Sequence, residues 1–61
     1  MKIVCIDNYG RDYIPDILIA DNVSKYYGEI IVKLLNDWSP ENGPYHFVLR
    51  SDDYVLYTPE P

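Results

Sequence analysis

The chain has little of the chemistry that small proteins use to reinforce a fold. Cys5 is the single cysteine among 61 residues. A lone thiol can form neither an internal disulfide nor a cysteine zinc site, so both kinds of reinforcement are excluded. Cys5 lies in the apolar run 3–6, where a free cysteine is usually a small buried hydrophobe. The alternative is a reactive nucleophile, which needs a neighbouring base or cation that this run does not supply. We therefore expect an inert Cys5 and a reduced, cytoplasmic setting.

Long apolar runs are also missing. No run approaches the roughly 20 apolar residues that span a bilayer, so we expect no membrane partner. Asp7 and Asn8 interrupt the first apolar stretch, so the start of the chain does not have the pattern of a secretory signal.

Basic residues are few and scattered. There are five Lys and Arg against ten Asp and Glu, which gives a net charge of −5. Binding to a phosphate backbone needs clustered basic residues, so direct nucleic-acid binding is excluded. The acidic balance favours a protein partner with a basic surface. The alternative interpretation is that the charge only maintains solubility.

Catalytic patterns are absent from the sequence. His46 is the single histidine, and no carboxylate or thiol stands at a spacing that would orient it as a general base. There is no glycine-rich phosphate loop, metal-ligand cluster or nucleophile elbow. The doublet Asp52-Asp53 could bind a divalent cation, but adjacent acids are also common in tight turns, and we favour the turn. We expect no enzymatic activity, no metal and no cofactor.

Local patterns predict an order of elements. A β-branched segment at 2–7 predicts a strand, and 8–11 predicts a turn in which Gly10 takes a positive φ. Residues 13–20 predict the second strand of the hairpin, with Ile17 and Ile19 on one face and Ile14, Asp16, Leu18 and Ala20 on the other. Alternation predicts a third strand at 45–50, and residues 55–57 could form a short fourth strand.

A helix is predicted between the second and third strands. Ser24 is a natural N-cap, with Asp21 as a competing cap. An apolar stripe then predicts a helix over about 25–37; its members are Tyr27, Ile30, Ile31, Leu34, Leu35 and Trp38. Gly28 costs a helix about 1 kcal/mol relative to Ala, which suggests close packing onto the sheet. The prediction is one α+β domain over residues 1–61, of order ββαβ(β). It has a three- or four-stranded antiparallel sheet and one amphipathic helix on one face.

Tyrosine is over-represented, with seven Tyr in the chain. Several lie near acidic residues, a combination suited to docking against Arg and Lys through cation–π contacts and ion pairs. The same composition could arise by chance in an acidic protein with a small core. The candidate partner-binding residues are Tyr9, Asp12, Tyr26, Asp52, Asp53, Tyr54 and Tyr57.

A sheet edge is the other candidate binding site. Three or four strands leave two edges that can recruit another chain, so a homodimer through an edge strand is possible. Pro15 lacks a backbone donor and is expected to block one edge in part. The edge near residues 55–57 is expected to be less protected.

Three stretches carry a resemblance to known proteins: Ile3–Arg11, Asp21-Asn22-Val23-Ser24 with the helix that follows it, and Pro44–Phe47 with Ser51–Tyr57. In these stretches the chain resembles small α+β proteins of tailed bacteriophages and prophages. The resemblance implies a binding protein that inhibits or modulates a bacterial host protein, such as a defence or nucleic-acid-handling enzyme, in the host cytoplasm. It transfers no functional residues. The alternative is a self-associating structural or accessory domain.

Overall fold

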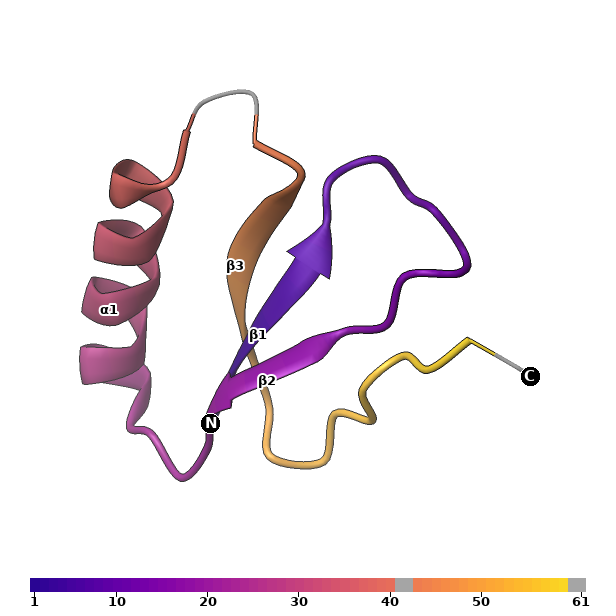
Figure 1. Ribbon diagram of the computed structural model, residues 1–61. Helices are drawn as coiled ribbons and strands as arrows, with labels where there is room; N and C mark the ends of the chain where they lie inside the picture. The colour runs from indigo at the N-terminus through magenta and orange to yellow at the C-terminus, as the bar shows by residue number, and fades with distance from the viewer. Residues whose placement is uncertain (41–42, 60–61) are drawn as a thin grey trace.

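The computed structural model describes residues 1–40 and 43–59 and has three strands and one helix in that part of the chain (Figure 1). The elements are β1 (Lys2–Asp7), β2 (Ile17–Ala20), α1 (Lys25–Trp38) and β3 (Tyr45–Arg50). The sheet is antiparallel in the order β2-β1-β3. The predicted α+β fold with one helix against an antiparallel sheet is therefore confirmed.

The core is centred on β1, the middle strand. Ile3 and Val4 are fully buried and Cys5 is almost so. Because successive strand residues point to opposite faces, their burial requires cover on both sides of the sheet. Burial, with a smaller contribution from the charge of Asp16, raises the pKa of the Cys5 thiol. The thiolate is disfavoured at neutral pH, as expected for an inert core cysteine.

Strand β2 is shorter than predicted. It begins at Ile17 rather than at residue 13, because Pro15 has no N–H for a ladder and the residues around it form a loop. A register shift also places Ala20 opposite Ile3 but Leu18 opposite Val4. Ala20 and Leu18 therefore lie on different faces, and the strict alternation predicted for this strand is wrong at the bulge.

Helix α1 begins and ends close to the predicted positions. The Ser24 hydroxyl accepts a hydrogen bond from the Tyr27 N–H at 3.2 Å, which confirms the N-cap. Gly28 is buried against β3: a Cβ there would lie 2.6 Å from Cδ1 of Leu49. The expected close packing at Gly28 is thus confirmed. Within the described residues, α1 packs on β3 and β1 and does not reach β2.

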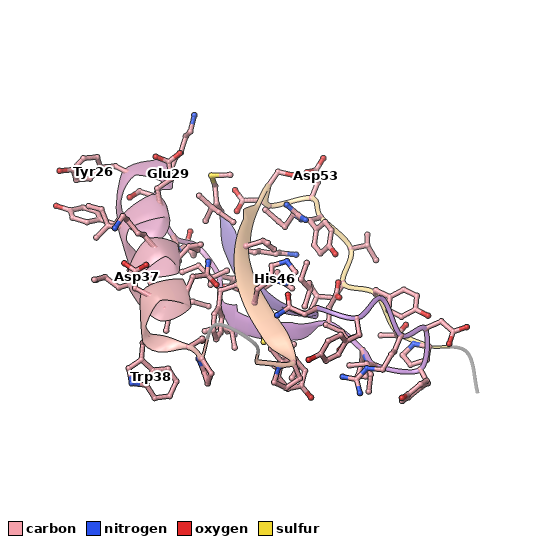
Figure 2. The ribbon with its side chains drawn as sticks, turned by 90° about the horizontal axis from the view of Figure 1, so that it is seen from above. Tyr26, Glu29, Asp37, Trp38, His46 and Asp53 are labelled. Carbon is pink, nitrogen blue, oxygen red and sulfur yellow. The ribbon has the colours of Figure 1, made fainter. Side chains whose placement is uncertain are left out.

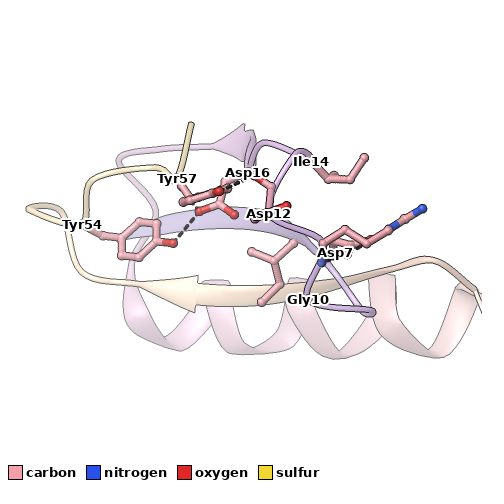
Figure 3. Close-up of a pocket in the computed structure, with 9 residues that line it drawn as sticks. Asp7, Gly10, Asp12, Ile14, Asp16, Tyr54 and Tyr57 are labelled. Carbon is pink, nitrogen blue, oxygen red and sulfur yellow. Dashed lines mark hydrogen bonds and ion pairs between the residues drawn. The ribbon is translucent and has the colours of Figure 1, made fainter. Parts of the chain in front are cut away.

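Residues 51–59 form no fourth strand within the described part of the chain. They make the predicted turn, with the Tyr54 N–H donating to the Ser51 carbonyl at 3.0 Å. They then cross the sheet face opposite α1, as Figure 3 shows. A backbone bond from the Asp16 N–H to the Tyr57 carbonyl, at 2.9 Å, joins them to the loop before β2. The two sheet edges are therefore β2 and β3, and the expectation of an edge at 55–57 is wrong.

The outer edge of β3 is occupied by a side chain from α1. The Phe47 N–H donates to Oδ1 of Asn36 at 2.8 Å, and Nδ2 of Asn36 donates to the Phe47 carbonyl at 2.9 Å. The amide thereby satisfies the outward backbone groups at the middle of this strand, as a neighbouring strand would. Natural sheets protect their edges with such cover.

Candidate functional site

An open pocket of about 350 Å³ lies on the sheet face opposite α1. Ile6 of β1 contributes to its floor, the loop 10–16 forms one wall, and Tyr54 and Tyr57 form the other. Figure 3 shows these side chains converging from segments far apart in the sequence. The pocket exists because residues 51–59 fold back over the sheet.

Asp16 fixes the two walls to each other. Its Oδ2 accepts the Tyr54 hydroxyl at 2.5 Å and the Tyr57 N–H at 2.8 Å. The bond to Asp16, followed by burial, raises the pKa of Tyr54, and nearby Arg50 opposes this shift. Tyr54 therefore stays protonated and acts as a donor, so its hydroxyl is part of the scaffold.

Tyr57 and Asp12 leave different groups available to a ligand. The Tyr57 hydroxyl donates to the Asp12 backbone carbonyl, which anchors a ring that remains 44% exposed. The carboxylate of exposed Asp12 has no hydrogen bond or ion pair with the residues that the structure describes. The same two residues, with Tyr13 and Pro59, line a second hollow of about 340 Å³. Asp12 and the Tyr57 ring thus face both hollows.

Among the residues that the structure describes, Arg11 is the one cation that lines the pocket, and its charge is already paired with Asp7. Arg11 holds Asp7 through its side chain and its backbone N–H, which lies 2.8 Å from Oδ2. These bonds lower the pKa of Asp7 to about 2 from an ordinary 3.8, and they raise that of Arg11. The Arg11 guanidinium also lies 5.3 Å from the Tyr9 ring centroid and 5.8 Å from that of Tyr13. Asp12 and Asp16 therefore remain as the pocket's excess negative charge.

Of the seven sequence candidates, the structure brings Asp12, Tyr54 and Tyr57 together in this pocket. Tyr9 lies close by, exposed on the same loop and against Arg11.

The other three candidates lie elsewhere. Tyr26 points outward from α1 (Figure 2) and packs edge-to-face on Tyr27, with ring centroids 5.1 Å apart. Asp52 pairs with the Met1 amine at 2.9 Å. Asp53 accepts the Ser51 hydroxyl at 2.6 Å, a bond that lowers the pKa of Asp53. Asp53 thus makes a local contact within the turn, whereas Asp52 ties the turn to the N-terminus.

Sequence reasoning missed Asp16, Asp7 and Arg11 as site residues. One signal was available for Asp16: it is an acid placed among Ile14 and Leu18 on one face of a predicted strand. A carboxylate at such a position needs a partner, and the partner turned out to be Tyr54. No comparable local signal marks the pairing of Asp7 with Arg11.

The other reactive side chains do not form a constellation. Cys5 pairs with Phe47 across the sheet and His46 with Ile6, so Cys5 and His46 point to opposite faces. Nδ1 of His46 is hydrogen-bonded to Oδ1 of Asn8. In residues 1–40 and 43–59, no group of three or more His, Cys, Asp or Glu side chains is placed to hold a metal ion. In the same residues, no helix combines the length and apolar character that a membrane crossing needs.

No protein-family model, curated protein or solved structure matches the chain.

Proposed function

We propose that this protein acts by binding another protein and that the pocket receives an Arg or Lys side chain of that partner. The observation that carries the proposal is the carboxylate of Asp12, which has no partner among the described residues and lines the pocket with Asp16 and the exposed Tyr57. A carboxylate gives a guanidinium two parallel hydrogen bonds, and an aromatic face adds a cation–π contact.

The size and lining of the pocket suit one long side chain. At about 350 Å³ it lies at the lower end of the 300–1,000 Å³ range of ligand sites. Ile6 and Ile14 line it, and they offer apolar contact to the methylene stem of a basic residue. Arg11 is held by Asp7, so it does not compete for Asp12.

The net charge of the chain also favours a partner with a basic surface. A chain of net charge −5 attracts a basic surface and accelerates the encounter, and added salt screens this attraction. The resemblance to phage proteins adds a proposed role, in which the partner is a bacterial host protein, such as a defence or nucleic-acid-handling enzyme, that binding inhibits. The second candidate function is a self-associating accessory domain. It is favoured by exposed apolar side chains on α1, such as Leu34 and Trp38.

A titration with N-acetyl-arginine amide tests the pocket directly. In two-dimensional NMR spectra of the full chain, we expect saturable shifts of the Asp12, Asp16 and Tyr57 amide signals, which weaken as salt is added. Asp12→Asn should abolish them, whereas Asp37→Asn, which removes an exposed acid from α1, should not. Shifts of equal size in both variants, or none in the parent chain, would overturn the pocket as the binding site.

Affinity capture then tests the partner. The immobilised chain, its Asp12→Lys variant and its Asp37→Lys variant are exposed to bacterial lysate, and captured proteins are identified by mass spectrometry. We expect a salt-eluted protein that is retained by the parent chain and by Asp37→Lys but lost from Asp12→Lys. Capture that Asp12→Lys leaves unchanged would contradict the proposal.

A further inference from the structure

Helix α1 carries two parallel rows of side chains with the same 4-3-4 spacing. One row, made of Gly28, Val32, Leu35 and Ser39, faces the sheet and holds the least exposed positions of the helix and its C-cap. The other, here called the outer seam, consists of Tyr27, Ile31, Leu34 and Trp38. The outer seam is exposed, most of all at Trp38 (82%) and Tyr27 (64%). Its 4-3-4 spacing is that of the a and d positions through which two helices pack.

The outer seam points along the sheet toward β2. Asn36 contacts the outer edge of β3, and at 3.6 residues per turn the seam lies about 140–180° around the helix from Asn36. The seam therefore overhangs the part of the sheet that α1 does not cover. On that side Ile17 shares the helix face with its neighbour Cys5 and is 46% exposed. The seam and Ile17 are therefore exposed apolar groups on the same side of α1.

The charge distribution indicates which partner this surface fits. None of the residues of the outer seam or of β2 is charged. The charges of Glu29, Lys33 and Asp37 lie about 90–170° around the helix from the seam's centre, on the side away from the sheet. A basic partner would find no charge to pair with here. Two copies of an acidic chain repel each other elsewhere, but at this face they can meet without opposing like charges.

The available area is sufficient for a specific contact. The outer seam, Ile17 and Ile30 together expose roughly 700 Å² per copy, counting about 250 Å² for a fully exposed aromatic side chain. Stable interfaces bury about 800 Å² per partner. Alone, the chain buries just three hydrophobic side chains among those that the structure describes, so a second copy would supply cover that the monomer lacks.

We infer that the outer seam packs against the outer seam of a second copy, antiparallel about a two-fold axis. Tyr27 of one copy then meets Trp38 of the other, and Ile31 meets Leu34. The antiparallel arrangement sets each helix dipole against the opposite end of its neighbour. A two-fold contact is self-complementary, so it closes at two copies. This inference goes beyond the proposed function, because the pocket lies on the other face of the sheet.

The state of association and the fluorescence of Trp38 test the inference together. Trp38 is the single tryptophan, so its emission reports on this face. Sedimentation velocity of the full chain from about 1 to 500 µM should show a monomer–dimer equilibrium, because the available area lies slightly below that of a stable interface. The emission maximum should move to shorter wavelength over the same concentrations. A monomer throughout, or a dimer whose emission does not move, would overturn the inference.

Charge reversal at Leu34 distinguishes the seam from other contacts. Leu34→Glu and Leu34→Lys should each raise the dimer dissociation constant at least about tenfold, because like charges would meet near the axis. Mixing the two variants should restore dimers. Glu29→Lys, at an exposed position off the seam, serves as the control. Far-ultraviolet circular dichroism at the lowest concentration confirms that each variant is folded. If the folded Leu34 variants dimerise as well as the parent chain, the seam is not the interface.

Salt separates this inference from the proposed function. Apolar association of two acidic chains should be maintained or strengthened in 0.5 M NaCl, because screening weakens their mutual repulsion. Arginine binding at the pocket should weaken under the same conditions. Leu34→Glu should leave the arginine titration unchanged, and Asp12→Asn should leave the dimer unchanged. A failed dimer test therefore leaves the proposed pocket intact, and a failed arginine titration leaves the dimer inference intact.

Discussion

The hydroxyl of Tyr54 donates a 2.5 Å hydrogen bond to Asp16, across 38 positions of sequence. This bond, with the Tyr57 N–H on the same carboxylate oxygen, holds residues 54–57 over the sheet. This segment forms one wall of the pocket.

Removing that hydroxyl should loosen the segment without unfolding the sheet. We expect Tyr54→Phe to lower the free energy of unfolding by about 1–2 kcal/mol, since a hydrogen bond to a charged acceptor is lost while the ring is kept. Urea denaturation measures the loss. Tyr26→Phe is the matched control, because Tyr26 is an exposed tyrosine whose ring contact does not involve its hydroxyl. Equal losses in the two variants would contradict a specific role for the Tyr54 bond.

Acid should destabilise the protein through Asp7. Its pKa is lowered to about 2 in the folded chain from an ordinary 3.8. A group with a lowered pKa stabilises the fold above the unfolded-state value and loses that contribution as the pH falls. Stability should therefore decline from about pH 3.8 toward pH 2. A carbon-detected NMR titration gives the pKa, and urea unfolding at stepped pH gives the stability.

Asp7→Asn provides the test of that assignment. The variant should be less stable than the parent chain at neutral pH, because the side chain of Asp7 is 5% exposed and binds Arg11. Its stability should change less between pH 3.8 and pH 2. Asp37→Asn should keep the parent profile, because the Lys33–Asp37 pair is exposed and such pairs contribute little. If the stability of Asp7→Asn still falls steeply between pH 3.8 and pH 2, another group causes the loss in acid.

Enlarging Gly28 should separate the helix from the sheet. A Cβ at this position lies 2.6 Å from a terminal methyl of Leu49. Gly28→Val should destabilise the fold by about 1–3 kcal/mol through overpacking. Gly28→Ala should cost less, because the Leu49 methyl can rotate away and Ala favours the helix by about 1 kcal/mol. Thermal and urea unfolding measure both, with Glu29→Val as the exposed control. A stabilised Gly28→Val variant would refute the close contact.

Opening the edge of β3 should promote larger assemblies. Asn36→Ala removes both bonds to Phe47 and should cost about 1 kcal/mol, because the freed groups reach water. The bare edge can then pair with other chains. Multi-angle light scattering should detect species larger than a dimer in Asn36→Ala and not in Lys33→Ala. If Asn36→Ala forms no larger species, the amide does not protect the edge.

Sequence patterns predicted those elements whose causes are local. The apolar stripe and Ser24 located α1, and alternation gave Tyr45–Arg50 with its observed bounds. The start of β2 and the path of residues 55–57 were predicted wrongly. The start of β2 depends on Pro15, which cannot donate to the ladder. The path of residues 55–57 depends on Asp16, whose carboxylate binds a distant tyrosine. Short apolar runs do not encode such a choice of partner.

The candidate site was predicted only in part, because distant pairings decide which of its residues come together. Tyrosine beside acid suggested Asp12, Tyr54 and Tyr57, which the structure places in one pocket. The pairings of Tyr54 with Asp16 and of Asp52 with the Met1 amine span 38 and 51 positions of sequence. Composition indicates which residues are suited to a binding surface. Which of them lie together depends on how residues 51–59 cross the sheet.

The contact between Asn36 and Phe47 also bears on the order of folding. The two residues are 11 positions apart, and α1 precedes β3 in the chain. Helices form within about a microsecond, faster than strands pair. Because α1 packs mainly on β3, the amide reaches Phe47 as the helix and this strand dock together. The strand edge would then be covered as soon as that contact forms, which shortens the time for which a newly made protein exposes it to its neighbours.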